Sequence, residues 1–521
     1  MMSPRAVRII VLVLVVVLCL GGLSAALVGL ASDDGRRSDA PVRANPPTPP
    51  PPGATDAPDP ALTPYYSQRL SWEPCRDRYD CSTLTVPLDY TQPGGETIDL
   101  ALLRVPAGVP DARVGSLVVN PGGPGSPGTD YAASGQFGPR LTDHFDIVGF
   151  DPRGTGQSSP VDCLSDEELD AYLAGDPSPD DAAEAEAAVA ATSALLRGCT
   201  ELSGELAAHL STVEAARDLD VLRAALGEPG LLYLGASYGT FLGATYAELY
   251  PAKVGRLVLD GGVDPSLDQR QRSLGQAEGF ETALRAYVTD CVDSGDCFLG
   301  DTVQDGLDRI ASFLAEVDAE PLELEGGREL TEGLAFLGLV TPLYVRDYWP
   351  LLDRGLESAF DGDGAVLALL ADAYASRSPD GTYLDNSSEA IAPINCLDDP
   401  SSTPVDQVEA ALPAFEQVSP TLASHFVWSL VGCVGFEPRA AEPRPTIRAE
   451  GAAPIVVVGT TRDPATPYAW SVALAEQLES GVLVSRDGDG HTGYRSDNAC
   501  VDAAVEDYLV DATVPQDGLS C

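Results

Sequence analysis

Short apolar runs separated by stretches of helical periodicity make up most of the chain from about Trp72 onward. This alternation predicts an α/β fold, in which a mostly parallel central sheet is covered by helices. The runs that we expect to be strands span residues 84–86, 98–104, 116–120, 146–150, 231–234, 256–259, 454–459 and 482–485.

One helix can be delimited from its end signals. Ser211 and Glu214 form a capping box, apolar side chains recur on one face from Ala215 to Leu226, and Gly227 ends the pattern. A predicted strand follows at once.

The middle of the chain, residues 264–442, shows a different pattern. Strong strand runs are missing, whereas Leu307, Ile310 and Leu314 share one helical face and residues 365–375 form another apolar helix. We therefore expect a large, mainly helical cap inserted into the sheet-containing core. The expected segments are a signal peptide or membrane anchor (1–31), a proline-rich linker (32–66), the first part of the core (67–263), the cap or lid (264–442) and the second part of the core (443–521).

The first segment suggests export. Arg5 and Arg8 precede an almost unbroken apolar run over residues 9–31, which at ~1.5 Å per residue is long enough to cross a bilayer. The run fits either a secretion signal or an uncleaved anchor, and its sequence leaves cleavage open. We expect a secreted or envelope-anchored protein that contacts a membrane only through this segment.

The charge excludes one class of partner. The chain of 521 residues has 31 Lys and Arg against 79 Asp and Glu, a net charge of −48. A polyanion would be repelled over the whole surface, so no nucleic-acid partner is expected.

The cysteines fit an oxidising compartment. Cys19 lies in the apolar segment, and the other ten form near neighbours along the chain. The expected disulfides are Cys75–Cys81, Cys163–Cys199, Cys291–Cys297, Cys396–Cys433 and Cys500–Cys521. The four histidines are scattered far from any cysteine cluster, so neither a metal site nor a cofactor is expected.

The central chemical signal is Gly-Ala-Ser-Tyr-Gly at residues 235–239, between a predicted strand and a helix of small residues. A serine at such a sharp turn is held with its hydroxyl exposed, and flanking glycines avoid clashes with the strand and helix. Ser237 is therefore the expected nucleophile of an α/β-hydrolase core.

A serine nucleophile needs a base and an acid, which follow it in this order along the chain in this fold. His491 lies in a glycine-rich loop after the strand at 482–485 and is the expected base. Asp463 follows the strand at 454–459 and is the expected acid, with Asp260 and Asp264 as competitors. His144, His209 and His425 are expected to be structural or solvent-facing.

A glycine-rich turn over residues 120–128 follows another predicted strand. Developing charge on an attacked carbonyl needs backbone N–H donors close by. The N–H groups of Tyr238, Gly123 and Gly122 are the expected oxyanion hole. The segment Asp151–Ser158 is expected to shape the floor of the site.

These motifs together resemble the secreted tripeptidyl aminopeptidases of actinobacterial type, relatives of prolyl aminopeptidases. The resemblance rests on the Gly-Gly-Pro-Gly turn, Asp-Pro-Arg-Gly, Gly-x-Ser-Tyr-Gly, the long cap and the Thr-Pro pair after Asp463, and it covers about residues 70–521. It implies a serine exopeptidase whose cap admits only the N-terminus of a peptide or protein. The pair Ser126-Pro127 departs from the family pattern, which leaves the substrate fit there open.

Recognition of a free α-amino group needs carboxylates, for which the cap offers Glu278, Glu281 and Asp398. Two other functions stay open at this point. An esterase or lipase would use the same three residues with a different pocket, and a wall-tethered binding protein would keep the fold without the activity.

Overall fold

The computed structural model describes residues 52–76 and 78–521. Ten strands form one sheet in the order β1-β2-β3-β5-β4-β6-β7-β10-β11-β12. These strands are β1 (Glu73–Cys75), β2 (Tyr79–Pro87), β3 (Thr97–Val105), β4 (Gly115–Asn120), β5 (Phe145–Phe150), β6 (Leu231–Ala236), β7 (Val254–Asp260), β10 (Ile455–Arg462), β11 (Gly481–Asp489) and β12 (Leu519–Ser520).

The sheet is antiparallel at one edge and parallel elsewhere. β1, β2, β3 and β5 pair antiparallel in that order, and every pair from β5 across to β12 is parallel. All six residues of β4 are buried, as expected of a strand covered on both faces. Each of the eight predicted strands is confirmed; of the ten strands in this sheet, the short β1 and β12 lacked a sequence signal.

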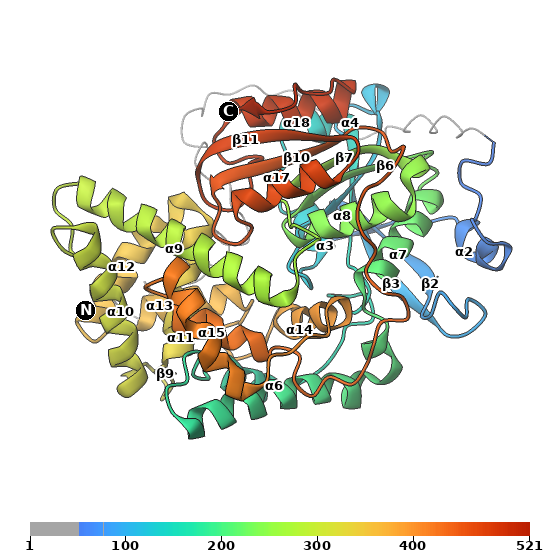
Figure 1. Cartoon of the computed structure of the whole chain (residues 1–521). Coiled ribbons are helices and arrows are strands. Elements are labelled where there is room, and N and C mark those ends of the chain that lie inside the picture. The colour runs from blue at the N-terminus through green and yellow to red at the C-terminus, as the bar shows by residue number, and fades with distance from the viewer. Residues whose placement is uncertain (1–51, 77) are drawn as a thin grey trace, which may run out of the picture.

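Helices cover both faces of the sheet. On one face α7 (Thr212–Ala225), α8 (Tyr238–Leu249) and α17 (Tyr468–Gln477) contribute to a core that includes Tyr233 and Leu257. On the other face α3 (Gly128–Ala133), α4 (Pro139–His144) and α18 (Ala499–Asp511) pack on Val119 and Val458. A short helix, α2 (Thr63–Tyr66), packs against α7 (Figure 1). The α/β-hydrolase architecture predicted from the sequence is thus present.

A second, helical body lies beside the sheet, at the left and bottom of Figure 1. It has two apolar clusters of its own. One buries Leu284, Ile310 and Leu352, and the other buries Val408 and Phe415. Its elements after β7 are α9 (Gln269–Asp293), α10 (Val303–Ala319), β8 (Leu322–Glu323), β9 (Glu329–Leu330), α11 (Glu332–Val340), α12 (Trp349–Phe360), α13 (Ala365–Tyr374), α14 (Ser387–Asp398), α15 (Val405–Val418) and α16 (Ala423–Val427).

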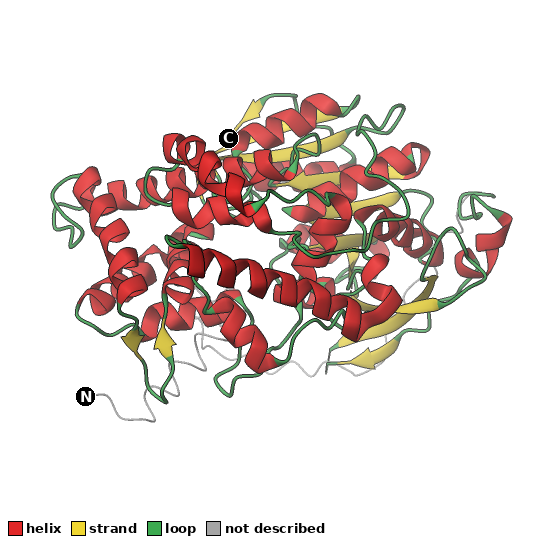
Figure 2. Cartoon of the chain, turned by 60° about the horizontal axis from the view of Figure 1, so that its bottom comes forward, coloured by secondary structure: helices red, strands yellow, loops and turns green. Residues whose placement is uncertain are grey.

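Two further helices join this body from an earlier part of the chain. α5 (Asp166–Leu173) and α6 (Ala182–Ser203) fall within the segment that the sequence analysis gave to the core, yet α6 contacts α14. Figure 2 brings this lower face forward and shows the helices gathered on one side, away from most of the strands. The cover over the sheet is therefore built from two separate insertions.

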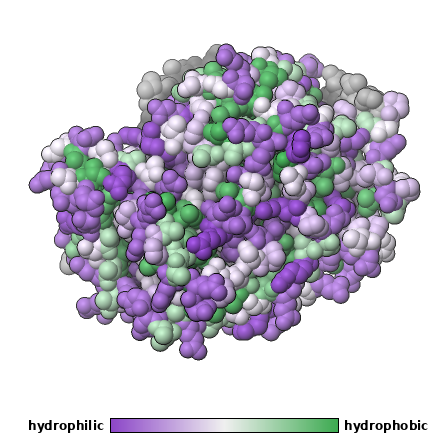
Figure 3. Space-filling model, viewed as in Figure 1, coloured by the Kyte–Doolittle hydropathy of each residue, from purple (hydrophilic) through white to green (hydrophobic). Residues whose placement is uncertain are grey.

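Five disulfides join the neighbours that the cysteine spacing paired: Cys75–Cys81, Cys163–Cys199, Cys291–Cys297, Cys396–Cys433 and Cys500–Cys521. Structural disulfides of this number are typical of proteins that mature outside the cytosol. The visible face in Figure 3 is mostly hydrophilic, with apolar residues scattered across it.

The predicted export segment at 1–31 and most of the proline-rich linker lie outside the described residues. Within residues 52–76 and 78–521, helices that combine the length and the apolar character needed to span a bilayer are absent.

Arg153 of the Asp-Pro-Arg-Gly motif ties the sheet to α7. Its fully buried guanidinium donates to both oxygens of Asp218, at 2.8 Å, and to the carbonyls of Pro87, Leu88 and His209. Arg153 therefore holds the loop after β5 against β2 and α7.

Replacing Arg153 by Met should destabilise the fold strongly, because it leaves the buried carboxylate of Asp218 without its counter-ion. We expect a loss of about 3–5 kcal/mol in the free energy of unfolding, measured by urea denaturation. Arg448→Met is the control, because Arg448 pairs with Glu450 in the open and its loss should cost less than about 1 kcal/mol. Equal effects of the two changes would contradict this role.

Candidate active site

Ser237 sits at the turn between β6 and α8 in a strained backbone conformation, with φ 57° and ψ −126°. A Cβ on Gly235 would lie 2.4 Å from the carbonyl oxygen of Gly239, and one on Gly239 would lie 2.8 Å from Oδ1 of Asn120. Only glycine fits at either position, so the motif is needed for this sharp turn.

Asp463 follows β10, and its carboxylate is buried with a full set of partners. Oδ1 accepts hydrogen bonds from the backbone N–H groups of Ala465 and Thr466, at 3.0 and 2.8 Å, and Oδ2 accepts one from Thr492, at 3.0 Å. Nδ1 of His491 lies 2.9 Å from both oxygens. The carboxylate thereby fixes which ring nitrogen of His491 carries the proton.

His491 follows β11. This strand pairs with β10, the strand that leads to Asp463. Burial favours the neutral imidazole, but the charge and the hydrogen bond of Asp463 outweigh it and raise the pKa of His491 above its ordinary value. Oγ1 of Thr466 also lies 3.4 Å from Nδ1. The same carboxylate stabilises the imidazolium that forms when His491 takes a proton.

The two competing acids have other tasks. Asp260 accepts the backbone N–H groups of Gly493 and Tyr494, at 2.7 and 2.8 Å, and burial raises its pKa to about 6. Asp264 accepts from Ser266 and Gln477. Neither carboxylate forms a hydrogen bond with His491 within the described part of the chain, which leaves Asp463 as its partner.

Ser237 and His491 both lie close to the end of β7. The N–H of Ser237 donates to the carbonyl of Asp260, at 2.9 Å, and a Cβ on the next residue, Gly261, would lie 3.3 Å from Cε1 of His491. Among residues 52–76 and 78–521, Ser237 Oγ forms no hydrogen bond with the imidazole. Such a bond often tightens only when substrate binds.

The glycine-rich turn after β4 packs on the nucleophile. A Cβ on Gly122 would lie 2.8 Å from Cβ of Ser237 and 3.0 Å from the backbone nitrogen of Tyr238. However, the N–H of Gly122 already donates to Oδ1 of Asn120, at 3.0 Å. This bond removes Gly122 from the expected oxyanion donors and leaves Gly123 and Tyr238, the first residue of α8.

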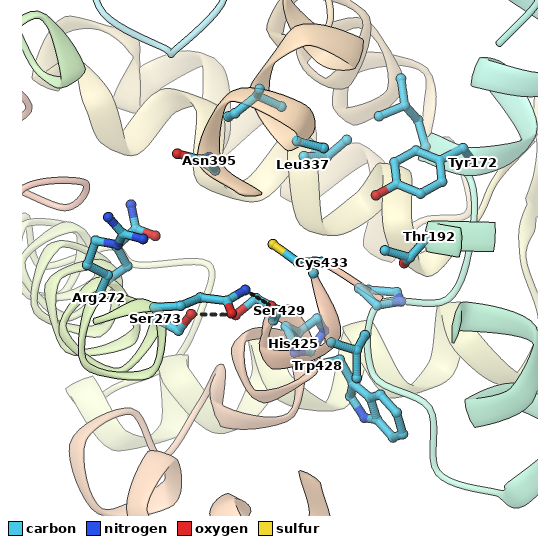
Figure 4. A pocket seen from close by; sticks show the side chains of 18 of the residues that line it. Tyr172, Thr192, Arg272, Ser273, Leu337, Asn395, His425, Trp428, Ser429 and Cys433 are labelled. Carbon is cyan, nitrogen blue, oxygen red and sulfur yellow. Dashed lines mark hydrogen bonds between the residues drawn. The ribbon is translucent and has the colours of Figure 1, made fainter. Parts of the chain in front are cut away.

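A pocket of about 830 Å³ opens beside the nucleophile, lined by Ser237, Tyr238, Gly123 and side chains from both insertions. Figure 4 shows part of its wall, with Tyr172, Thr192, Leu337 and Trp428 among the lining residues. The contribution of α5 and α6 was not foreseen from the sequence. Their paired capping signals, Ser165 with Glu168 and Asp181 with Glu184, were the available hint.

Ionisable side chains line this pocket: Asp176, Glu184, His425 and Arg272. The three carboxylates proposed from the sequence are not among the residues that line it. Glu278 is exposed, Glu281 accepts from Thr421 and Arg285, and Asp398 binds the N-terminus of α7 through Thr212. The sequence offered no local signal to separate these acids from the ones that face the pocket.

His425 was expected to be structural or solvent-facing, but its ring lines the pocket. It stacks on Phe336, and its Nε2 lies 3.0 Å from Oε1 of Glu332. His209 binds Glu214, and Nδ1 of His144 lies 2.9 Å from the carbonyl oxygen of Arg140.

The cap also contacts the loop of His491 directly. The N–H of His491 donates to the carbonyl of Tyr344, at 2.8 Å, and the two rings meet edge to face. Arg346 pairs with Asp489, at 2.7 Å, and with Asp290 of α9. The position of His491 thus depends on the packing of the cap.

Comparisons with known proteins agree with this geometry. The family model described as "TAP-like protein" matches residues 419–521. The chain is 37% identical over 483 residues to "Serine protease Hip1" of Mycobacterium tuberculosis, covering 88% of this chain and 92% of that protein. It is 30% identical over 468 residues to "Tripeptidyl aminopeptidase" of Streptomyces lividans, covering 87% and 86%.

The chain belongs to the tripeptidyl aminopeptidase family of α/β-hydrolases.

Another member of this set of relatives is named as an esterase. "Carboxylesterase B" of Mycobacterium tuberculosis is 37% identical over 502 residues, which cover 91% of this chain and 94% of that protein. A solved "Alpha/beta hydrolase fold protein" from Chitinophaga pinensis is 12% identical, with a TM-score of 0.33 over 85% of this chain and 98% of that one. Membership of the family makes this protein a serine hydrolase.

The raised pKa of His491 predicts how activity responds to pH. The imidazole must be neutral to take a proton, so activity should be lost as pH falls through its pKa. In Asp463→Asn the raising charge is gone, so the acid limb of the profile of kcat/KM against pH should shift to lower pH. The rate should also fall by about four orders of magnitude, because the imidazole tautomer is no longer fixed.

Asp264→Asn is the matched control, since Asp264 does not contact His491. Its acid limb should stay at the wild-type position. An unshifted limb in Asp463→Asn would mean that Asp463 does not control the base.

Proposed function

We propose that this protein is a serine exopeptidase that releases short peptides, expected to be tripeptides, from substrate N-termini through an acyl-enzyme on Ser237. The single observation that carries the proposal is the pocket itself, which joins Ser237 to the half-buried carboxylates of Asp176 and Glu184, groups able to bind an α-ammonium group. The tripeptidyl aminopeptidase relative supports the same substrate class.

In the proposed reaction Ser237 Oγ attacks the scissile carbonyl while His491 takes its proton. Asp463 stabilises the imidazolium that forms. The N–H groups of Tyr238 and Gly123 stabilise the negative oxygen of the tetrahedral intermediate. The C–N bond then breaks, the leaving amine takes the proton from His491, and water hydrolyses the acyl-enzyme by the same route.

A pair of carboxyl groups forms the proposed ammonium site. Burial and the neighbouring Glu332 raise the pKa of Asp176 to about 7. Burial acts in the same sense on Glu332, but the hydrogen bond and the charge of His425 lower the pKa of that group. Ser178 donates to both oxygens of Glu332, at 2.9 Å. A cation placed here would relieve the repulsion between the two acids, which favours a substrate amine.

We also propose that the apolar segment at residues 1–31 exports the protein and either releases it or anchors it at the cell envelope. The five disulfides support maturation in an oxidising compartment. Peptide or protein N-termini outside the cytosol would then be the substrates.

A carboxylesterase is the second candidate, favoured by the relative named as one. Its chemistry at Ser237 would be identical, and only the group that enters the pocket would differ. The two candidates are separated by whether a free amine on the substrate matters.

Purified protein should cleave tripeptidyl fluorogenic amides with a free amine at least about tenfold faster than the N-acetylated compounds, because the ammonium group binds charged acceptors. Mono- and dipeptidyl amides should be poorer substrates than the tripeptidyl ones. In Ser237→Ala, turnover and labelling by a fluorophosphonate probe should both disappear. Faster cleavage of the acetylated series would contradict an exopeptidase while leaving a hydrolase.

Asp176→Asn tests the ammonium site. The change keeps the shape but removes the charge, so the free-to-acetylated ratio of kcat/KM should fall about tenfold. Glu278→Gln removes a charge from the exposed surface of α9 and should leave the ratio as it is. If both variants changed the ratio alike, the effect would come from the overall charge of the cap and not from this site.

A further inference from the structure

Arg272 of α9 is a cation on the wall of the pocket whose donors are unused. Its guanidinium has five N–H groups, and it forms no hydrogen bond with any residue in the described ranges 52–76 and 78–521. Its ion pair with Asp399 is long, at 3.6 Å, and its side chain is only 18% exposed. A half-buried guanidinium with free donors is poorly satisfied in the substrate-free protein.

The neighbouring carboxylates are committed elsewhere. Asp399 accepts from the backbone of Gln269, at 2.7 Å, and from the backbone and hydroxyl of Ser401. Asp398 accepts two hydrogen bonds from Thr212. The other charged neighbours of Arg272 are Asp268, whose side chain caps α9, and Arg444.

Arg444 makes the local environment more cationic. Burial, and next the positive charge of Arg444, lower the pKa of Arg272. Nη1 of Arg444 is itself buried without a hydrogen-bond partner in the described chain. Arg272 and Arg444 are thus two neighbouring arginines with unused donors. An incoming anion would accept these hydrogen bonds and reduce the repulsion between the two charges.

Arg272 and Ser237 line the same pocket, and contacts on two helices connect the surroundings of Arg272 with the reacting groups. Gln276, one turn further along α9, donates to the carbonyl of Ala465 beside the catalytic acid, at 3.2 Å. The guanidinium of Arg444 lies over the ring of Phe241, which is one turn after Ser237 on α8. Asn395 of α14 lines the same pocket, and its side-chain amide has no hydrogen bond within the described chain (Figure 4).

We propose that Arg272, together with the amide of Asn395, binds a carboxylate group of the peptide substrate close to the scissile bond. The inference rests on the proposed function, since it takes a peptide as the substrate. Two sources share this chemistry: an aspartate or glutamate side chain next to the scissile bond, and the C-terminal carboxylate of a short peptide. Arginine presents a planar fork that matches a carboxylate.

Two matched series of substrates distinguish the sources. One compares tripeptidyl fluorogenic amides ending in Asp with those ending in Asn, and the other compares tetrapeptides with a free or an amidated C-terminus. The wild-type protein should prefer the carboxylate in one series, and Arg272→Gln should lower that preference about tenfold or more. Arg272→Lys should keep part of it, since a charge remains without the fork.

Arg270→Gln is the control, because Arg270 lies on the same helix, carries the same charge and is exposed. It should keep the wild-type preference. The proposal is wrong if the wild-type protein prefers the carboxylate in neither series, or if Arg272→Gln retains the preference, or if Arg270→Gln loses it equally.

Hydrolysis of p-nitrophenyl acetate separates this proposal from the proposed function. If the ester is cleaved but none of the peptides is, the exopeptidase assignment fails. Carboxylate binding is then read from inhibition of ester cleavage by the tetrapeptide acid against the tetrapeptide amide. Stronger inhibition by the acid that depends on Arg272 and not on Arg270 supports the site, and equal inhibition overturns it.

Discussion

The site depends on one buried carboxylate. Asp463 accepts hydrogen bonds from two backbone groups of its own loop, from the backbone of Thr492 and from the imidazole of His491. It therefore joins the loop after β10 to the loop after β11. The loops can meet because these strands are neighbours and parallel, with Val458 opposite Val484, so their carboxyl ends reach the same edge of the sheet.

The cap belongs to the same arrangement. Tyr344 accepts the backbone N–H of His491, and Asp489, just before this loop, is held by Arg346 from the cap and by Arg462 from β10. Phe280 of α9 packs on the ring of Tyr344. Packing of the cap therefore also positions His491, the proposed base.

The sequence predicted the parts of the site that follow from local rules. A strand, a sharp turn and a helix around Ser237 need glycines at fixed positions, and a loop after a strand is where an acid or a base must lie. Asp260 and Asp463 both satisfy this local rule, because each lies at the end of a strand. Only the structure shows that Asp260 binds Gly493 and Tyr494 while Asp463 binds the imidazole.

What could not be predicted depends on contacts between distant segments. Glu278 on α9 and Asp176 in the loop after α5 are both acids of the cover over the sheet, and only packing decides that the first faces solvent and the second the pocket. The alanine-rich face of α6 gives no hint of its partner, α14, for the same reason. The oxyanion hole differs for another reason: the N–H of Gly122 donates to the side chain of Asn120 in the same turn, a bond that the glycine pattern does not predict.

The charge of the whole molecule adds an asymmetry to the pocket. With a net charge of −48, the field outside attracts an ammonium group and repels a carboxylate, and it fades over about 8 Å in physiological salt. Asp176 and Glu332 act in the same sense as this field, whereas Arg272 acts against it and only at short range. A peptide bound as we propose would be drawn in by its N-terminus and would reach Arg272 only after entry, an order that suits the proposed exopeptidase.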